Sequence, residues 1–357
     1  MFLPMKRYLI FLMPLWLLAC EVDSPLVAPT REPVTLAVPA HFPQAPIPAS
    51  NVLTEAKIKL GKQLFFDPIL SKDQTLSCAS CHPPENAFAD PRAFSLGVGG
   101  VSGDEPSKRR NAPALFNVVY HQNFFWDGSN PSLETQILFP IESPFEMANK
   151  VDTVLKRLRA HPEYPRLFWQ TFQDSISAKT LTDAIASFER SLISAGSKFD
   201  QFMASGMDST VFTAAEWRGY KLFFLESAGN NHAECFHCHG GFNFDDPEGR
   251  FRNNGLYSFY QDFGRYNVTG NPLDVGKFKV PSLRNIEYTA PYMHDGSLET
   301  LEEVLAHYAS GGKPHPNRDI LIGNIQMTEE EQRDIIAFLM TLSDPDFVNN
   351  PAHRPED

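Results

Sequence analysis

The stretch LSCASCHPPENAFADP, residues 76–91, places two cysteines three residues apart and follows the second at once with a histidine. Two thiols at this spacing could clip a zinc ion, form a redox disulfide or attach a haem. His82 favours the haem, because C-x-x-C-H is the attachment pattern of c-type haem. In that pattern Cys78 and Cys81 each hold one vinyl group, and the imidazole that follows them reaches the iron.

The same motif returns in AECFHCHGGFNF, residues 233–244, which contains Cys235, Cys238 and His239. A chain of 357 residues with 5 Cys and 11 His gives about two chance matches to C-x-x-C-H per thousand such chains. Two matches in one chain therefore predict two covalently bound haem c groups. They account for four of the five cysteines.

The remaining cysteine, Cys20, ends a segment with the features of an export signal. A charged start precedes a short apolar run that ends in LLAC, and such a run is too short to span a membrane. The ending resembles a bacterial lipobox, which predicts a lipoprotein-type signal peptide over 1–19 and a lipidated Cys20. A plain signal peptide cut elsewhere is the alternative. Seven prolines and no apolar periodicity in residues 22–50 predict an extended tether over 20–50.

Composition limits the partners of the folded part. The net charge of −12 and the isoelectric point near 5.4 argue against nucleic acid as a partner, and they leave open a basic electron carrier. The roughly 300 residues that follow the tether are enough for two ordinary domains.

The two cysteine motifs belong to matching stretches of chain. GKQLFF at 61–66 precedes the first motif, and GYKLFF at 219–224 precedes the second. Further on, residues 112–135 match residues 280–300. This duplication predicts an all-α protein with two cytochrome c-like haem domains and long loops. The expected units are an N-terminal domain with connecting helices at 51–205, a C-terminal domain at 206–345 and a tail at 346–357.

The copies differ after their shared SLET sequence. In the second copy Thr300 and Glu303 suit the capped start of a helix. In the first copy, segment 140–147 contains two prolines, which predict a loop that carries Glu142 and Glu146. The second copy would thus offer its haem a phenol from a helix, and the first a carboxylate from a loop.

Other helices are expected from apolar spacing and capping patterns. Segments 151–172 and 181–195 have apolar residues at helical spacing and predict packing helices without a chemical role. Thr213 and Glu216 form a capping-box pattern at the start of a helix that would carry aromatic side chains to a haem edge.

Together with the two C-x-x-C-H motifs, four stretches resemble the bacterial di-haem cytochrome c peroxidase and MauG superfamily: RRNAPALFN (109–117), FFWDG (124–128), PFEM (144–147) and APYMHDGSLETLEE (290–303). The resemblance covers about 61–342. The stretches CFHCHGGFNF and NNGLY are most similar to MauG-like, methanobactin-associated di-haem enzymes. The resemblance implies two cytochrome c-like domains whose haems are separated by a tryptophan.

The resemblance also implies roles for individual residues. His82 would be the proximal ligand of a peroxide-reacting haem, His239 that of an electron-transfer haem, and Trp126 would lie between the two. In the second copy His294 stands where the first has Trp126. One further implied site binds calcium through three residues: Asn111 and the backbone carbonyls of Thr289 and Pro291.

The proton chemistry falls, by the same resemblance, to Glu146, in a pocket that Gln136 and Pro140 also line. Splitting peroxide needs a group that moves a proton from its inner to its outer oxygen, and a carboxylate on a constrained loop can do this. A solvated loop acid is the alternative for Glu146 and the favoured interpretation of Glu142. Residue type alone would make Trp126 a packing residue.

Two departures separate the sequence from gated peroxidases of the superfamily. Those enzymes carry a histidine after the first haem motif that caps the iron at rest, whereas no histidine occurs here between His82 and His121. They also carry a methionine where this sequence has Tyr308, which is the MauG-like choice. A phenolate stabilises oxidised iron and lowers its potential, whereas a thioether raises the potential. Met293 is a rival sixth ligand, although core packing is its favoured role.

The sequence therefore predicts an exported di-haem peroxidase, lipid-anchored in the periplasm at the outer membrane. It would reduce hydrogen peroxide at the N-terminal haem, with electrons relayed through the C-terminal haem. The electrons would come from a small cytochrome or cupredoxin, or from a secreted partner protein. Two alternatives are a MauG-like oxidase that modifies residues of a partner protein and a non-catalytic di-haem electron-transfer cytochrome.

Overall fold

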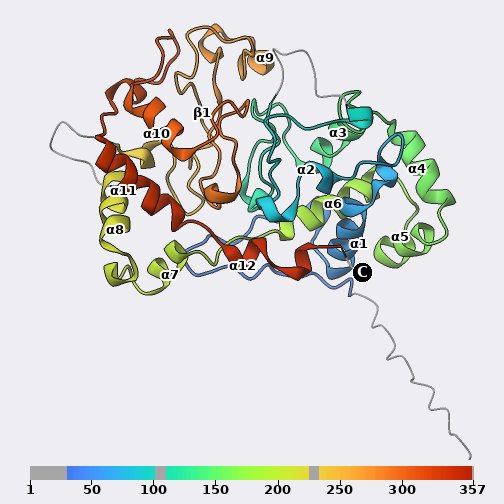
Figure 1. Ribbon diagram of the computed structural model, residues 1–357. Helices are drawn as coiled ribbons and strands as arrows, with labels where there is room; N and C mark the ends of the chain where they lie inside the picture. Colours follow the sequence, from blue (N-terminus) through green and yellow to red (C-terminus); the bar gives the residue numbers. More distant parts are fainter. Residues whose placement is uncertain (1–29, 101–109, 225–232, 356–357) are drawn as a thin grey trace, which may run out of the picture.

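The computed structural model describes residues 30–100, 110–224 and 233–355, and within these ranges the chain is mostly helical (Figure 1). The sequence predicted an all-α protein, and the described chain is mostly helical with little strand, as that class requires. One two-stranded antiparallel sheet pairs Phe251 with Lys279. The elements are α1 Glu55–Phe66, α2 Leu133–Gln136, α3 Leu138–Glu142, α4 Val151–Ala160, α5 Tyr164–Phe172, α6 Ala178–Ser191, α7 Lys198–Ala204, α8 Ala214–Phe224, β1 Phe251–Arg252, α9 Tyr266–Thr269, β2 Phe278–Lys279, α10 Leu301–Ala309, α11 Glu329–Met340 and α12 Pro345–Val348.

Two helix pairs organise the molecule, with α1 against α6 on one side of Figure 1 and α8 against α11 on the other. The repeated glycines mark the two crossings. A Cβ on Gly61 would lie 1.9 Å from the carbonyl oxygen of Ala184, and a Cβ on Gly219 would lie 1.9 Å from that of Asp334. The two helices of each pair can come this close only because the residue at the crossing has no side chain. This explains why both copies carry glycine there.

Each helix pair has its own hydrophobic core. The first core gathers residues of α1 and α6, including Leu64 and Phe65 at 0% exposure. The second gathers residues of α8 and α11, including Phe223 and Phe338. A small third cluster of Trp126, Tyr260 and Phe278 is separate from both.

The capped helix starts are confirmed. Thr213 Oγ1 accepts a hydrogen bond from the Glu216 backbone nitrogen, and Glu216 accepts one from the Thr213 nitrogen at 2.6 Å, at the start of α8. Thr300 and Glu303 form the same reciprocal pair at the start of α10. Both pairs satisfy backbone donors that a helix start leaves open.

Two local predictions were wrong. The expected loop after α2 begins as the short helix α3, which includes Pro140 and ends at Glu142. Proline is tolerated there because the backbone nitrogens in the first turn of a helix make no hydrogen bond within the helix. The expected single helix at 151–172 is two helices, α4 and α5, because Pro162 interrupts the hydrogen-bond ladder between them.

The prediction of an extended tether is wrong for residues 30–50, which pack along the folded body. Phe42 is 6% exposed. The centre of its ring lies 4.7 Å from that of Phe242 and 4.7 Å from the guanidinium carbon of Arg284. His41 Nε2 lies 2.8 Å from Asp200. Proline-rich composition predicts an extended backbone, but it does not predict whether that backbone docks.

The segment 346–357, expected to be a tail, is anchored over most of its described length. Phe347 and Val348 of α12 are buried in the first core, although α12 follows the second helix pair in sequence. Figure 1 shows α12 running beneath the molecule toward α1. The end of the chain therefore ties the second half to the first.

Matched asparagines join the halves. Asn117 and Asn285 both adopt left-handed backbone conformations, with φ of 55° and 53°. Asn117 of the first half donates to Asn243 Oδ1 of the second at 3.2 Å, and Asn285 of the second half donates to the Ser194 hydroxyl of the first at 2.9 Å. Asparagine tolerates positive φ better than most residues, and its amide adds the hydrogen bond that fixes the turn.

Within the described ranges, no helix combines the length and apolar composition that a membrane crossing requires. The predicted signal peptide and Cys20 lie outside the described residues.

Candidate functional site

Both C-x-x-C-H motifs form the same local structure. Cys78–Ser80 and Cys235–His237 are single 3-10 turns. The backbone nitrogen of His82 donates to the Cys78 carbonyl at 2.9 Å, and that of His239 donates to the Cys235 carbonyl at 2.8 Å. None of the four motif cysteines forms a disulfide within the described residues. Each turn thus presents two sulfur atoms and one imidazole to the same neighbourhood.

Each motif histidine is held by its Nδ1 atom. His82 Nδ1 lies 2.8 Å from the Phe88 carbonyl oxygen. His239 Nδ1 lies 3.1 Å from the Phe244 carbonyl oxygen and 3.2 Å from that of Pro281. A backbone acceptor at Nδ1 places the proton there and leaves Nε2 as the metal-binding atom.

Burial keeps these histidines neutral. It lowers the pKa of His82, and it lowers the pKa of His239 to about 4. A neutral imidazole is the form that binds iron. The two observations together fit a pair of proximal haem ligands.

The thiols are poorly suited to redox exchange. Burial raises the pKa of Cys78 and raises that of Cys235 to about 12, so neither is a ready thiolate. In the part of the chain that the structure describes, no group of three or more His, Cys, Asp or Glu side chains is placed to hold a metal ion. The structure therefore favours haem attachment over a zinc clip or a reactive dithiol.

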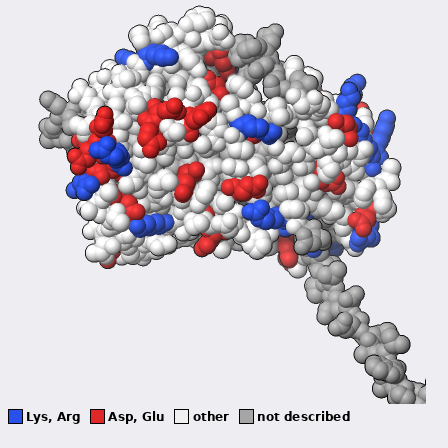
Figure 2. All heavy atoms as spheres, viewed as in Figure 1, with Lys and Arg blue, Asp and Glu red and all other residues white. Residues whose placement is uncertain are grey.

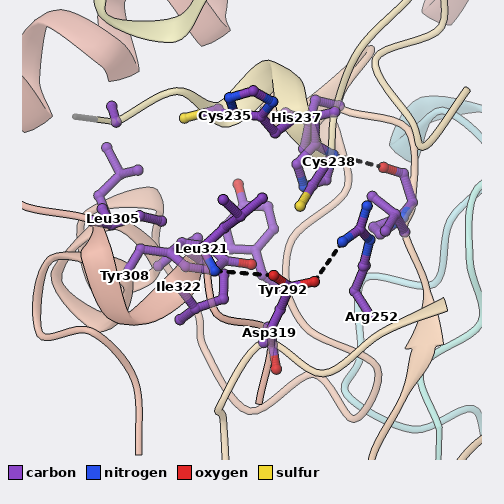
Figure 3. A pocket seen from close by; sticks show the side chains of 18 of the residues that line it. Cys235, His237, Cys238, Arg252, Tyr292, Leu305, Tyr308, Asp319, Leu321 and Ile322 are labelled. Carbon is purple, nitrogen blue, oxygen red and sulfur yellow. Dashed lines mark hydrogen bonds and ion pairs between the residues drawn. The ribbon is translucent and has the colours of Figure 1, made fainter. Parts of the chain in front are cut away.

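The second motif borders a cavity of about 370 Å³ with a largely apolar lining. Figure 3 shows Cys235 and Cys238 on one side of this cavity and Leu305 and Tyr308, both from α10, on the other. His239 also lines it. The cavity thus combines two attachment thiols, a proximal histidine and a candidate ligand from a capped helix, which is the residue set that a haem c requires.

The two rival sixth ligands share one neighbour. Asn254 donates from Nδ2 to Met293 Sδ at 3.2 Å, and it lies near enough to Tyr308 to act on the pKa of that phenol. Burial raises the pKa of Tyr308 to about 12, while the Asn254 contact opposes this. Iron binding through the phenol would displace its proton. Asn254 was not predicted as a site residue, because an asparagine in NNGLY carries no signal of its own.

Trp126 lies between two cavities. Its side chain is 8% exposed, and it lines both the 370 Å³ cavity and a smaller cavity of about 80 Å³ beside it. Its Nε1 donates to the Asn111 carbonyl at 2.8 Å, and its own carbonyl accepts from the Lys279 nitrogen at 2.7 Å. These bonds fix the indole at the wall of the second haem cavity.

Glu146 lies in the turn after α3, beside the first motif. Burial raises the pKa of Cys81 most, and the nearby charges of Asp90 and then Glu146 raise it further. The Val98 nitrogen donates to the Glu146 carbonyl at 2.8 Å. A Cβ on Gly97 would lie 2.0 Å from the Phe145 carbonyl oxygen, so only glycine lets this crossing form. Gly97 is a second residue that the sequence did not single out.

The other residues assigned to the first pocket lie on the same short segment. Gln136 ends α2 and is half-buried, and Pro140 lies within α3. Glu142, at the end of α3, is exposed. Gln136, Pro140 and Glu146 therefore lie on one continuous segment, formed by α2, α3 and the turn that follows α3. Their assignment to a haem pocket stays a prediction.

The three residues of the expected calcium site line the 80 Å³ cavity together. The amide hydrogens of Asn111 go to the carbonyls of Asp90 and Arg92, which leaves its side-chain oxygen for a cation. The described residues around the cavity include Lys279 but no Asp or Glu. Amide and carbonyl oxygens fit Ca²⁺, which also needs several further oxygen ligands. Calcium binding stays a prediction.

The fold and the site define a duplicated helical protein with two c-type haem attachment motifs. A family model described as di-haem cytochrome c peroxidase matches residues 55–208. The methylamine utilization protein MauG of Methylorubrum extorquens is 39% identical over 340 residues, which cover 93% of this chain and 92% of that protein. The cytochrome c551 peroxidase of Nitrosomonas europaea is 35% identical, with 86% of each chain covered.

A solved structure supports the same conclusion. The crystal structure of a MauG-like protein associated with microbial copper homeostasis is 36% identical, with a TM-score of 0.81, and the match covers 89% of this chain and 97% of that one. The chain belongs to the di-haem cytochrome c peroxidase and MauG family of oxidoreductases, as the sequence motifs predicted. Membership implies two haem c groups.

Proposed function

We propose that the protein is an exported di-haem peroxidase that reduces hydrogen peroxide at the haem of the first motif. Electrons reach that site through the haem of the second motif and Trp126. The haems supply the redox chemistry when they are bound. The chain holds them through Cys78 and Cys81 in one half and Cys235 and Cys238 in the other.

The observation that carries the proposal is the repeated turn with a buried histidine held at Nδ1. Both turns fit an iron ligand, but only the second faces a described phenol, from Tyr308. The first has a carboxylate turn nearby instead. This asymmetry suits one reactive site and one electron-transfer site, and it argues against a purely electron-transferring cytochrome.

Glu146 would move the proton. Its turn is pinned by the Val98 hydrogen bond and by the close crossing of Gly97, so its backbone has little freedom. A carboxylate held in this way can take a proton from the inner oxygen of peroxide and return it to the outer oxygen, which leaves as water. Gln136 and Pro140 would shape the same pocket.

The source of the electrons separates two versions of the proposal. A small cytochrome or cupredoxin would make the protein a conventional peroxidase. A secreted substrate protein whose residues are oxidised would make it MauG-like, and Tyr308 favours this version because a phenol ligand supports oxidised iron. Figure 2 shows acidic side chains gathered over the α10–α11 side of one face, which suits a partner with a basic contact surface.

The location is part of the proposal. Residues 1–19 would act as a lipoprotein-type signal peptide, and a lipidated Cys20 would hold the protein at the periplasmic face of the outer membrane.

Glu146→Gln tests the proposal. We expect both haems and the ferric spectrum to be kept, because the residue lies in an exposed turn, while peroxide-driven oxidation slows by about a hundredfold. Glu142→Gln is the matched control, since Glu142 is also exposed and lies four residues away. A Glu146→Gln protein that turns over peroxide at the wild-type rate would remove this residue from the mechanism.

A further inference from the structure

A half-buried cluster of titratable side chains that the proposed chemistry does not use lies between the two halves. It consists of His121 from the first half and Asp245 and Lys279 from the second. His121 Nε2 lies 3.8 Å from Asp245 Oδ2, which is too far for a hydrogen bond. No hydrogen-bond partner for this buried atom exists among the described residues.

Lys279 occupies the meeting point of three cavities. It lines the 370 Å³ cavity of the second motif, the 80 Å³ cavity beside Trp126 and a polar cavity of about 260 Å³. His121 lines the last two of these. The Lys279 side chain therefore borders these cavities, and the residue is half-buried.

Asp245 does not fully compensate the charge of Lys279. Burial lowers the pKa of Lys279 to about 8, and Asp245 only partly opposes this. Asp245 already accepts a hydrogen bond from Asn243 at 2.8 Å. A partly desolvated ammonium costs free energy, and so does an imidazole whose buried Nε2 has no hydrogen-bond partner among the described residues, unless a further group meets them.

We propose that His121 and Lys279 bind a carboxylate of the cofactor, a haem propionate, at the junction of the three cavities. The inference rests on the proposed function, because it requires the haems to be bound. A haem carries two propionates, and a lysine at the wall of its cavity is a natural partner for one of them. The imidazole supplies a second donor from the other half, so the contact would also link the two halves.

The position of Lys279 gives the contact an electrostatic consequence. Its backbone nitrogen is bonded to the Trp126 carbonyl, so the side chain is fixed beside the residue expected between the haems. A positive charge paired with a propionate offsets the negative charge that would otherwise favour ferric iron. Loss of the lysine should therefore lower the reduction potential of that haem.

The test compares Lys279→Met and His121→Phe with the wild type. The pyridine haemochrome assay first establishes two haems per chain. Resonance Raman spectra then report the propionate bending bands, and spectroelectrochemistry at one fixed pH reports both reduction potentials. We expect Lys279→Met to shift a propionate band and to lower one potential. His121→Phe should shift the band as well.

Two further variants separate charge from packing. Lys279→Arg keeps the charge and should restore the potential. Lys277→Met is the matched control, because Lys277 lies two residues away and pairs with Asp274 at 3.2 Å. If Lys279→Met fails to load haem, Lys279→Gln gives the same readout with less change in polarity.

Distinct outcomes would overturn the inference or its premise. A Lys279→Met protein with two haems, unchanged Raman bands and unchanged potentials would refute propionate binding. A second outcome would show that the ligand is a diffusible anion. Acetate or inorganic phosphate would then shift the reduction potential of the wild type to a plateau as its concentration rises, and Lys279→Met would leave the propionate bending bands unchanged. A wild type with fewer than two haems would overturn the proposed function.

Discussion

Replacement of Gly219 by alanine should loosen the contact between α8 and α11. The new Cβ would lie 1.9 Å from the Asp334 carbonyl oxygen, where real Cβ atoms essentially never come closer than 3.0 Å. The helices must therefore separate by about 1 Å, and the atom they meet is backbone rather than a flexible side chain. Overpacking of this kind costs about 1–3 kcal/mol. Because the atom that is met is rigid backbone, the cost lies at the upper end of this range, and after alanine regains about 1 kcal/mol of helix propensity the net loss should be about 2 kcal/mol.

The same reasoning applies to Gly61 in α1, where the distance to the Ala184 carbonyl oxygen is also 1.9 Å. Guanidinium unfolding of the haem-loaded protein, followed by circular dichroism, measures both changes as a lower midpoint. Lys221→Ala is the control, because Lys221 is exposed on α8 and surface substitutions usually change stability by about 0.5 kcal/mol or less. Alanine variants at both glycines that unfold at the wild-type midpoint would refute this explanation of the repeat.

Three further predictions follow from individual residues. Tyr308→Met should raise the reduction potential of the second haem and Met293→Leu should leave it unchanged, as measured by spectroelectrochemistry; the reverse pattern would make Met293 the ligand. Burial raises the pKa of Glu189 from 4.5 to about 8, so the native state binds this proton more tightly than the unfolded state does. The free energy of unfolding should therefore fall as the pH rises from about 5 to about 8. Glu189→Gln should remove part of this fall, and an identical pH dependence of the unfolding midpoint in both proteins would contradict it. Cys20→Ser should move the protein from the membrane fraction to the soluble periplasm, and unchanged fractionation would rule out a lipid on this residue.

The sequence predicted those features that depend on local patterns. C-x-x-C-H fixes the spacing of two thiols and one imidazole, and both motifs form the expected turn with a buried histidine. The threonine–glutamate pairs predicted the starts of α8 and α10, because a capping box involves only four consecutive residues.

Features that depend on long-range packing were not predictable in the same way. Asn254 lies near both rival ligands only because the chain brings α10 and the turn at Met293 to the same cavity. The docking of Phe42 and the burial of Phe347 in the first core depend on segments far away in sequence. The repeated glycines were visible in the sequence, but the reason for them, a carbonyl group at the helix crossing, required the structure.

We propose that the first haem would be open to peroxide, whereas His239 and Tyr308 would hold the second. Electron paramagnetic resonance of the fully oxidised protein, before and after one equivalent of hydrogen peroxide, distinguishes these two states of the iron. We expect one high-spin and one low-spin ferric signal, because no histidine occurs between His82 and His121 to cap the first iron. Both signals should change on addition of peroxide without prior reduction. Two low-spin haems that ignore peroxide until the protein is half-reduced would contradict the account.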